Sequence, residues 1–267
     1  IPTKESRVLI QELNAQLGSQ TRRWELGEAS RHLLVVRDPA LEGSGPSLMN
    51  PPEWLIGRSW RRGLRKGSRN AGLRELIEQA EGLLETHAIN RVRVDLGENP
   101  ANLIWLWGAG PASAGPGAPA RGARSGVVFS RSFPLKGLAR RIGMEWMEGP
   151  RSLQEEPLQR LRQAIQARAK TAEVIYVHLE VDSADPVERL CAMERIDQLL
   201  IKPLAETAEE AQRRLLTVID GREGFVSFVA IGPGLAQQSI ARLTAESFSE
   251  SPLRFGDSAK LFAWLTG

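Results

Sequence analysis

NPANLIWLWGAGPASAGPGAP, residues 99–119, joins an apolar run with two tryptophans to a segment of glycine, alanine, serine and proline. The apolar run predicts a short strand at residues 102–108 that is buried on both faces. The segment after it has the low complexity of a loop. An apolar strand that ends in glycines could cradle a phosphate, join two domains, or descend from an ancestor that did either.

Strands and helices alternate on the C-terminal side of this stretch, and that order is typical of a parallel or mixed α/β sheet. Strands are predicted at residues 126–130, 145–149, 173–180 and 224–232, and helices at 134–143, 152–170, 187–204, 207–220 and 257–266.

A different pattern precedes the stretch. Residues 4–17 have apolar side chains at helical spacing, and Gly18 is a natural helix end. Two strands are predicted at residues 21–30 and 31–38, followed by a loop at 39–69 and a helix from its N-cap Asn70 to about Ala88. We therefore expect a separate α+β domain at residues 1–100 and an α/β domain at 101–267.

The composition is that of an ordinary globular protein, with 42% hydrophobic and 25% charged residues. The net charge is +3 and no concentrated basic tract is present, so we expect no nucleic acid partner. No apolar run is long enough to span a bilayer, and IPTKESRV at the start lacks the pattern of a signal peptide. The single cysteine, Cys191, is interpreted as a small core residue, and one cysteine fits a reducing compartment. We expect a cytoplasmic protein without a membrane partner.

No short motif in this sequence is by itself strong evidence for a catalytic or cofactor-binding site. GAGPASAG follows a predicted strand, but no helix begins directly on its glycines and the next strand ends without an acidic residue, which disfavours a dinucleotide site. The three histidines, His32, His87 and His178, are far apart in the sequence and are each interpreted as structural or surface residues. Asp182 and Asp185 follow a strand end, and a helix N-cap explains them best because a proline comes next.

Several segments, in one order, resemble the archaeal-type cofactor-independent (2,3-bisphosphoglycerate-independent) phosphoglycerate mutases. ASRHLLVVRD, PPEWLIG and HAINRVRVDLGENPANLIWLWGAG resemble the family's YRHLLV, PPHDI-x-G, NRAR and ANMIWLWGQG segments. PLKGLARRIGM resembles LIKGIARLAGM, VIYVHLE resembles VYVHVE, and AMERIDQLLIKPL resembles AIERIDERVVGPL. The resemblance spans most of residues 5–205 and then weakens.

The resemblance implies an α/β core of the alkaline phosphatase superfamily. Residues 1–100 would be its inserted, substrate-binding α+β domain, and residues 101–267 the C-terminal part of the core. The family's members are isomerases of glycolysis, which move a phosphoryl group between two hydroxyls of glycerate through a phosphoserine. Two divalent metals, such as Mn or Mg, activate the serine and stabilise the charge of the transition state.

The metal ligands of the family are mostly missing from this chain. The D-E-A-G-H type segment is replaced by VDSADPVERL, in which Asp182 or Asp185 could stand for the acid but no histidine follows. Ile231 and Gly232 stand near the family's Asp-His, and Phe248 and Ser251 near its final histidine and the aspartate after it. No histidine occurs after His178. We therefore predict no catalytic residues, no metal site and no cofactor.

The positions that resemble the family's substrate-binding residues are retained better than its metal ligands. The resemblance assigns substrate-binding roles to Arg31, Asn102, Trp105, Gly108 and Lys136. Arg31 and Lys136 are candidate phosphate-facing cations, and the alternatives are a surface arginine at a strand edge and a solvated helix lysine.

Two hypotheses follow. In the first, the chain is a pseudoenzyme that binds a phosphorylated small acid such as phosphoglycerate, or a protein partner, without turnover. In the second, it is an active mutase or related phosphotransferase whose missing groups come from an upstream segment or another chain. An incomplete core would also leave a sheet edge and an apolar face, for which we expect either a tight association with a partner or a retained N-terminal segment.

Overall fold

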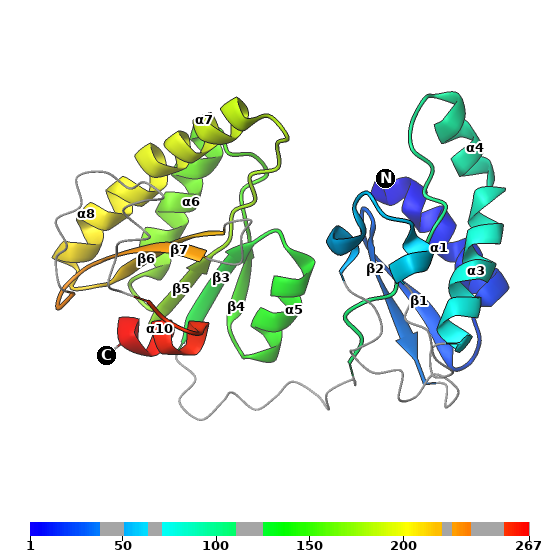
Figure 1. Ribbon diagram of the computed structural model, residues 1–267. Helices are drawn as coiled ribbons and strands as arrows, with labels where there is room; N and C mark the ends of the chain where they lie inside the picture. Colours follow the sequence, from blue (N-terminus) through cyan, green and yellow to red (C-terminus); the bar gives the residue numbers. More distant parts are fainter. Residues whose placement is uncertain (38–50, 64–70, 111–124, 221–225, 236–253, 267) are drawn as a thin grey trace. The chain divides into compact units, whose positions relative to one another are not determined.

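The computed structural model describes residues 1–37, 51–63, 71–110, 125–220, 226–235 and 254–266. Contacts divide the chain into two compact units, Ile1–Gly115 and Pro116–Gly267, and each is described by itself (Figure 1). Within these residues, no helix has the length and apolar character needed to cross a membrane.

The first unit begins with helix α1, Thr3–Leu17, which ends at Gly18 as predicted. The Gly18 N–H donates to the Asn14 carbonyl oxygen at 3.1 Å, and a Cβ at Gly18 would collide with that oxygen. The two predicted strands are confirmed as an antiparallel hairpin of β1, Arg22–Glu28, and β2, Arg31–Val36.

Helices make up most of the rest of this unit. The region predicted to be loop contains two short helices, and the predicted long helix is confirmed, although its expected N-cap, Asn70, lies outside the described residues. The helices are η1 (Pro52–Leu55), α2 (Trp60–Gly63), α3 (Ala71–Glu85) and α4 (Ala88–Asp95).

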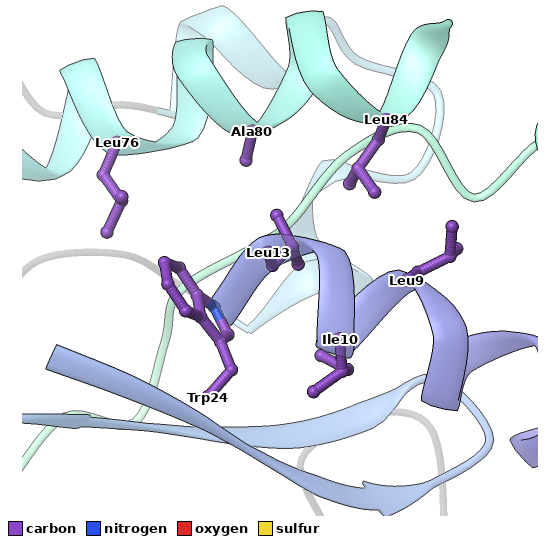
Figure 2. Close-up of a cluster of buried hydrophobic side chains, with 7 residues drawn as sticks. All are labelled: Leu9, Ile10, Leu13, Trp24, Leu76, Ala80 and Leu84. Atoms are coloured by element: carbon purple, nitrogen blue, oxygen red, sulfur yellow. The ribbon is translucent and has the colours of Figure 1, made fainter. Parts of the chain in front are cut away.

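The core of the first unit lies where α1 packs between the hairpin and α3 (Figure 2). In the close-up, Leu76 and Leu84 point from α3 toward α1, and Trp24 extends from the hairpin into the same cluster. The side chain of Asn14 exchanges two hydrogen bonds of 2.8 Å with the Trp24 backbone. These bonds hold β1 against α1 and satisfy polar groups at the margin of an apolar core.

The tryptophan segment does not form the predicted strand. Residues 99–110 have no regular secondary structure, and Trp105, together with Leu103, Ile104 and Leu106, packs against Leu73 and Ile77 of α3. These apolar side chains are covered by a helix instead of by neighbouring strands. This segment belongs to the first compact unit, Ile1–Gly115.

The second unit is built on a three-stranded parallel sheet, which confirms the predicted α/β alternation. Its order is β4 (Glu145–Glu148), β3 (Gly126–Ser130) and β5 (Val174–Val177), with helix α5 (Phe133–Arg141) between β3 and β4 and helix α6 (Glu155–Arg168) between β4 and β5. All residues of the central strand are buried. The core combines Val127 and Phe129 of β3 with Leu161 and Ile165 of α6.

A long helical segment follows β5. Helix α7 (Pro186–Ile196) continues through the π-helical turn η3 (Asp197–Ile201) into helix α8 (Lys202–Glu210). Cys191 lies on α7 but is exposed, so its interpretation as a core residue is wrong. No residue of helix α7 is buried, although its last residue, Ile196, is partly buried against the core cluster that contains Leu200 of η3.

The helix predicted at residues 207–220 is also wrong in its second half. Residues Leu215–Asp220 form strand β6, which pairs with β7, Val226–Ile231, in an antiparallel hairpin. The terminal helix is confirmed as α10, Ser258–Thr266, and its Trp264 contacts Phe228 of β7 with ring centroids 6.3 Å apart. The hairpin explains the error, since the partner strand supplies hydrogen bonds that a helix propensity does not anticipate.

Candidate functional site

Two buried polar residues of α4 hold the start of the tryptophan segment. The Asn90 side chain donates to the carbonyl oxygens of Leu84 at 2.7 Å and Ala101 at 3.1 Å, and it accepts the Ala101 N–H at 2.8 Å. Arg93 donates to the Asn99 carbonyl oxygen at 2.8 Å. The NRVR sequence of this helix is therefore explained by its contacts to residues 99–101.

The end of the tryptophan segment faces solvent. Trp107 is 51% exposed, and Gly108 and Ala109 are exposed as well. Gly108 has a φ of 66°, a conformation that favours glycine. Of the predicted ligand-binding residues here, Trp105 packs on α3, Asn102 is half-buried, and Gly108 lies at the exposed end. Gly108 is therefore more accessible to solvent than Asn102 and Trp105, which are both half-buried.

Arg31 lies at the other end of strand β2 from this segment. It is exposed and in register with Glu28 across the hairpin, whereas Val36, the last residue of β2, packs in the same cluster as Trp105. Five residues of strand correspond to about 16 Å. The structure therefore does not place Arg31 beside Trp105, although the sequence assigns both to substrate binding.

His32, next to Arg31, points inward. Its Nδ1 accepts the Gly27 N–H at 3.2 Å. Burial lowers the pKa of His32 from its ordinary value, and a hydrogen bond with the Ala29 backbone opposes this shift. His32 is accordingly a structural histidine of the hairpin, as the sequence suggests.

In the second unit, polar side chains meet where the parallel strands β3 and β5 end. The carboxyl ends of parallel strands are the usual place for ligand sites in α/β folds. Ser130 is fully buried, and its Oγ lies 3.3 Å from His178 Nδ1 and accepts the Ser132 N–H at 2.9 Å. The serine hydroxyl can donate to Nδ1 or accept a proton from it, and the histidine tautomer decides which.

Sequence reasoning missed the pairing of Ser130 with His178. The two residues are far apart in the chain, and His178 lies just after β5, with its N–H donating to the Phe129 carbonyl oxygen at 2.9 Å. A hydroxyl at the last position of a buried strand is the one signal that could have indicated it. The register between β3 and β5, which the sequence does not show, brings the two side chains together.

Lys136 lies in the first turn of α5, the helix that follows Ser130. Its Nζ lies 4.2 Å from the centroid of the Trp146 ring of β4 and 5.8 Å from that of Phe133. Among the residues described, no carboxylate lies within ion-pair distance of Nζ. Lys136 is half-buried and is not the fully solvated lysine of the alternative interpretation.

The side chains that could bind a metal are dispersed over the part of the chain that the structure describes. Within the ranges that the structure covers, no three His, Cys, Asp or Glu side chains lie close enough to hold one ion. Nδ1 of His87 accepts the Ile89 N–H at 3.1 Å, and the one carboxylate beside His178 is Glu180, 4.0 Å from Nδ1. Asp185 accepts the Val187 N–H at 2.9 Å as the N-cap of α7, as predicted.

The other positions compared with metal ligands carry no such chemistry where they are described. Ile231 ends β7 opposite Leu215, and a Cβ at Gly232 would collide with the backbone of residues 213–214. Phe248 and Ser251 lie outside the described residues, as do the side chains of Glu53 and Trp54 in PPEWLIG.

Comparison with known proteins gives a consistent set of relatives. The chain is 30% identical over 222 residues to the 2,3-bisphosphoglycerate-independent phosphoglycerate mutase of Methanosarcina barkeri, covering 79% of this chain and 54% of the relative. It is also 30% identical over 232 residues to mutase 2 of that description from Methanothermobacter thermautotrophicus, covering 82% and 56%. The chain thus spans about half the length of these curated relatives. No protein-family model matches it.

A solved structure supports the same fold. The cofactor-independent phosphoglycerate mutase from Thermoplasma acidophilum superposes with a TM-score of 0.52 and 21% identity, covering 99% of this chain and 70% of that chain. At this identity the likeness concerns the fold.

Proposed function

We propose, from the finding that this chain is a partial member of the 2,3-bisphosphoglycerate-independent phosphoglycerate mutase family, that it binds a phosphorylated small acid such as phosphoglycerate without turnover. In this proposal residues 1–100 descend from an inserted substrate-binding domain and residues 101–267 from the C-terminal part of an alkaline-phosphatase-like core. The ligand is held by cationic side chains, and no metal or phosphoserine takes part.

The observation that carries the proposal is the set of contacts that the three histidines make. His178 is the last histidine of the sequence, and its Nδ1 lies 3.3 Å from the hydroxyl of Ser130 at the end of β3. A two-metal site at the strand ends would instead require several acidic and imidazole ligands. His32 and His87 each accept a backbone N–H with Nδ1. This arrangement supports structural roles for all three.

Arg31 and Lys136 are the cations best suited to a phosphate. Within the described part of the chain, neither forms an ion pair with a carboxylate, so a ligand phosphate would not have to compete with one. Hydrogen bonds from ionised donors to phosphate are about twice as strong as neutral ones. Each cation lies in its own compact unit, so the two are tested separately.

The test is thermal unfolding with 3-phosphoglycerate, with Mn²⁺ and with both, together with a mutase assay. We expect the phosphoglycerate alone to raise the Tm, since a ligand at about 100 times its Kd stabilises the folded state by about 2.7 kcal/mol. The Lys136→Gln or Arg31→Gln variant should lose the shift, and Lys170→Gln, an exposed lysine at the end of α6, should keep it. No shift in the unmodified protein would refute the proposal.

The second candidate is an active mutase or related metal-dependent phosphotransferase that is completed by an upstream segment or another chain. The observation that favours it is length, because the chain covers only 54% of the Methanosarcina barkeri mutase. Stabilisation that requires Mn²⁺, together with turnover, would establish this candidate and exclude the first.

We also propose that the protein is cytoplasmic.

We further propose that another polypeptide continues its parallel sheet. Strands β4 and β5 are the outer strands of the sheet as described, and Tyr176 of β5 is 47% exposed. Unpaired strand edges invite pairing with another chain. Light scattering after size exclusion tests this, and a monomer that does not bind a hydrophobic dye would contradict it.

A further inference from the structure

The contact between Lys136 and Trp146 links the first turn of α5 to the strand that follows this helix. Lys136 Nζ lies over the face of the Trp146 indole, 4.2 Å from the ring centroid. Such a position attracts an ammonium group to the negative face of the ring. Phe133 adds a weaker contact at 5.8 Å from the same α5 turn. Both Lys136 and Trp146 are half-buried.

The charges around this contact leave the ammonium group uncompensated. The neighbouring carboxylates of β4 are directed to arginines: Glu145 lies 2.7 Å from Arg168, and Glu148 lies 3.8 Å from Arg151. The first turn of α5 contains no acidic residue. Anions are favoured near helix N-termini, so a bound anion beside Lys136 would be electrostatically favourable.

The identity of the aromatic residue also calls for an explanation. Trp146 Nε1 is buried and has no hydrogen-bond partner among the described residues. A buried N–H without a partner destabilises the fold, and phenylalanine or leucine would fill the same position of a strand without this penalty. The indole, however, presents the strongest cation-binding face of any side chain. Its presence beside an unpaired ammonium group therefore supports a role beyond filling volume.

We propose that Trp146 is a positioning residue, which holds the Lys136 ammonium group in one place for a phosphorylated or carboxylated acid. A lysine side chain has high rotamer entropy, and a ligand that must immobilise it pays this cost on binding. The ring restrains the side chain beforehand, and unlike a carboxylate it neither neutralises the charge nor competes with the anion. This inference rests on the proposed function, because it concerns the same lysine.

The experiment combines NMR of the protein labelled with ¹³C at lysine Cε with titrations of inorganic phosphate and 3-phosphoglycerate. The Lys136 resonance is assigned as the one missing from Lys136→Arg. We expect its Cε protons to be shifted upfield by the Trp146 ring, and this shift to be lost in Trp146→Leu but kept in Phe133→Leu. Circular dichroism establishes that each variant is folded.

The titrations give the functional readout. Trp146→Leu should weaken phosphoglycerate binding about two- to thirteenfold, because the ligand must then immobilise the lysine side chain itself at a cost of about 0.5–1.5 kcal/mol, and 1.4 kcal/mol corresponds to tenfold. Trp146→Phe, which keeps an aromatic face, should restore most of the affinity. Phe262→Leu, which removes an exposed aromatic side chain of α10, should leave the affinity unchanged.

The outcomes separate this inference from the proposed function. Unchanged affinity in Trp146→Leu, or a Lys136 resonance without an upfield shift, would overturn the positioning role even if phosphoglycerate binds. Binding of phosphate but not of phosphoglycerate, weakened in Trp146→Leu, would support the positioning role and refute the proposed ligand. An unmodified protein that binds neither anion would refute both.

Discussion

Asn90 and Ala101 exchange two hydrogen bonds: the asparagine side chain donates to the Ala101 carbonyl oxygen at 3.1 Å and accepts the Ala101 N–H at 2.8 Å. The same amide donates to the Leu84 carbonyl oxygen at 2.7 Å. One buried side chain thus joins the end of α3 to the start of the tryptophan segment, and it replaces the strand partner that the sequence suggested for this segment.

Replacing Asn90 by alanine should destabilise the first unit by about 2–3 kcal/mol, because buried backbone groups lose their partners. The measurement is urea unfolding followed by tryptophan fluorescence. Gln79→Ala, an exposed change on α3, is the control and should alter the free energy of unfolding by less than about 0.5 kcal/mol. A loss equal to that of the control would show that the exchange of bonds does not stabilise the fold.

Arg93 should be the most important ion-pairing residue of the first unit. Its side chain is 11% exposed and contacts Glu5 at 2.6 Å and Glu98 at 2.8 Å. Arg93→Met should lower the free energy of unfolding by about 1–3 kcal/mol, because it also removes the hydrogen bond to the Asn99 carbonyl oxygen. Arg160→Met, whose ion pair with Glu156 is exposed, should cost less than about 0.5 kcal/mol. Equal losses would contradict the assignment.

Alanine substitutions of Trp105 and Trp107 should differ in their effect on stability, because the first side chain packs in the core and the second is exposed. Trp105→Ala removes a side chain that packs on Leu73 and Ile77 and should cost about 3 kcal/mol of stability. Trp107→Ala changes a side chain that is 51% exposed and should stay within about 0.5 kcal/mol. Chemical denaturation of both variants tests this. A strongly destabilised Trp107 variant would show that the exposed end of the segment is packed in solution.

The stability of the hairpin should depend on pH through His32. Burial lowers its pKa in the folded state below the ordinary histidine value of 6.5, which applies to the unfolded chain. As the pH falls below that value, the unfolded state binds the proton first, so stability decreases with decreasing pH and is fully present above it. Urea unfolding from about pH 8 to about pH 5 measures the slope. His32→Gln, compared with the unmodified protein, should reduce it, and an unchanged slope would show that other groups are responsible.

Helix ends, the hairpin at residues 22–36 and the alternation of strands and helices could be predicted from the sequence, because they depend on local signals. Gly18 ends α1, Asp185 caps α7, and the buried run at residues 126–130 forms the central strand. The site could be predicted only as a set of residue types. Arg31 and Trp105 were grouped because they match one family, and the structure shows them near opposite ends of β2.

Two features could not be predicted, because each depends on a partner in another part of the chain. Residues 102–108 have the composition of a buried strand, yet α3 and not another strand covers them. Residues 215–220 form a strand because residues 226–231 supply its hydrogen bonds. Burial is satisfied by any apolar surface, so a pattern of apolar residues does not specify which surface covers it.

By itself the sequence determined the relationship to the mutases, the scarcity of histidine and the positions of most elements, since these are properties of residue identity and local spacing. Only the tertiary structure decided that Asn90 anchors the tryptophan segment, that Ser130 meets His178, and that Lys136 rests on Trp146. These pairs join different elements, and the packing of helix on strand and the register between strands bring their atoms within a few ångströms.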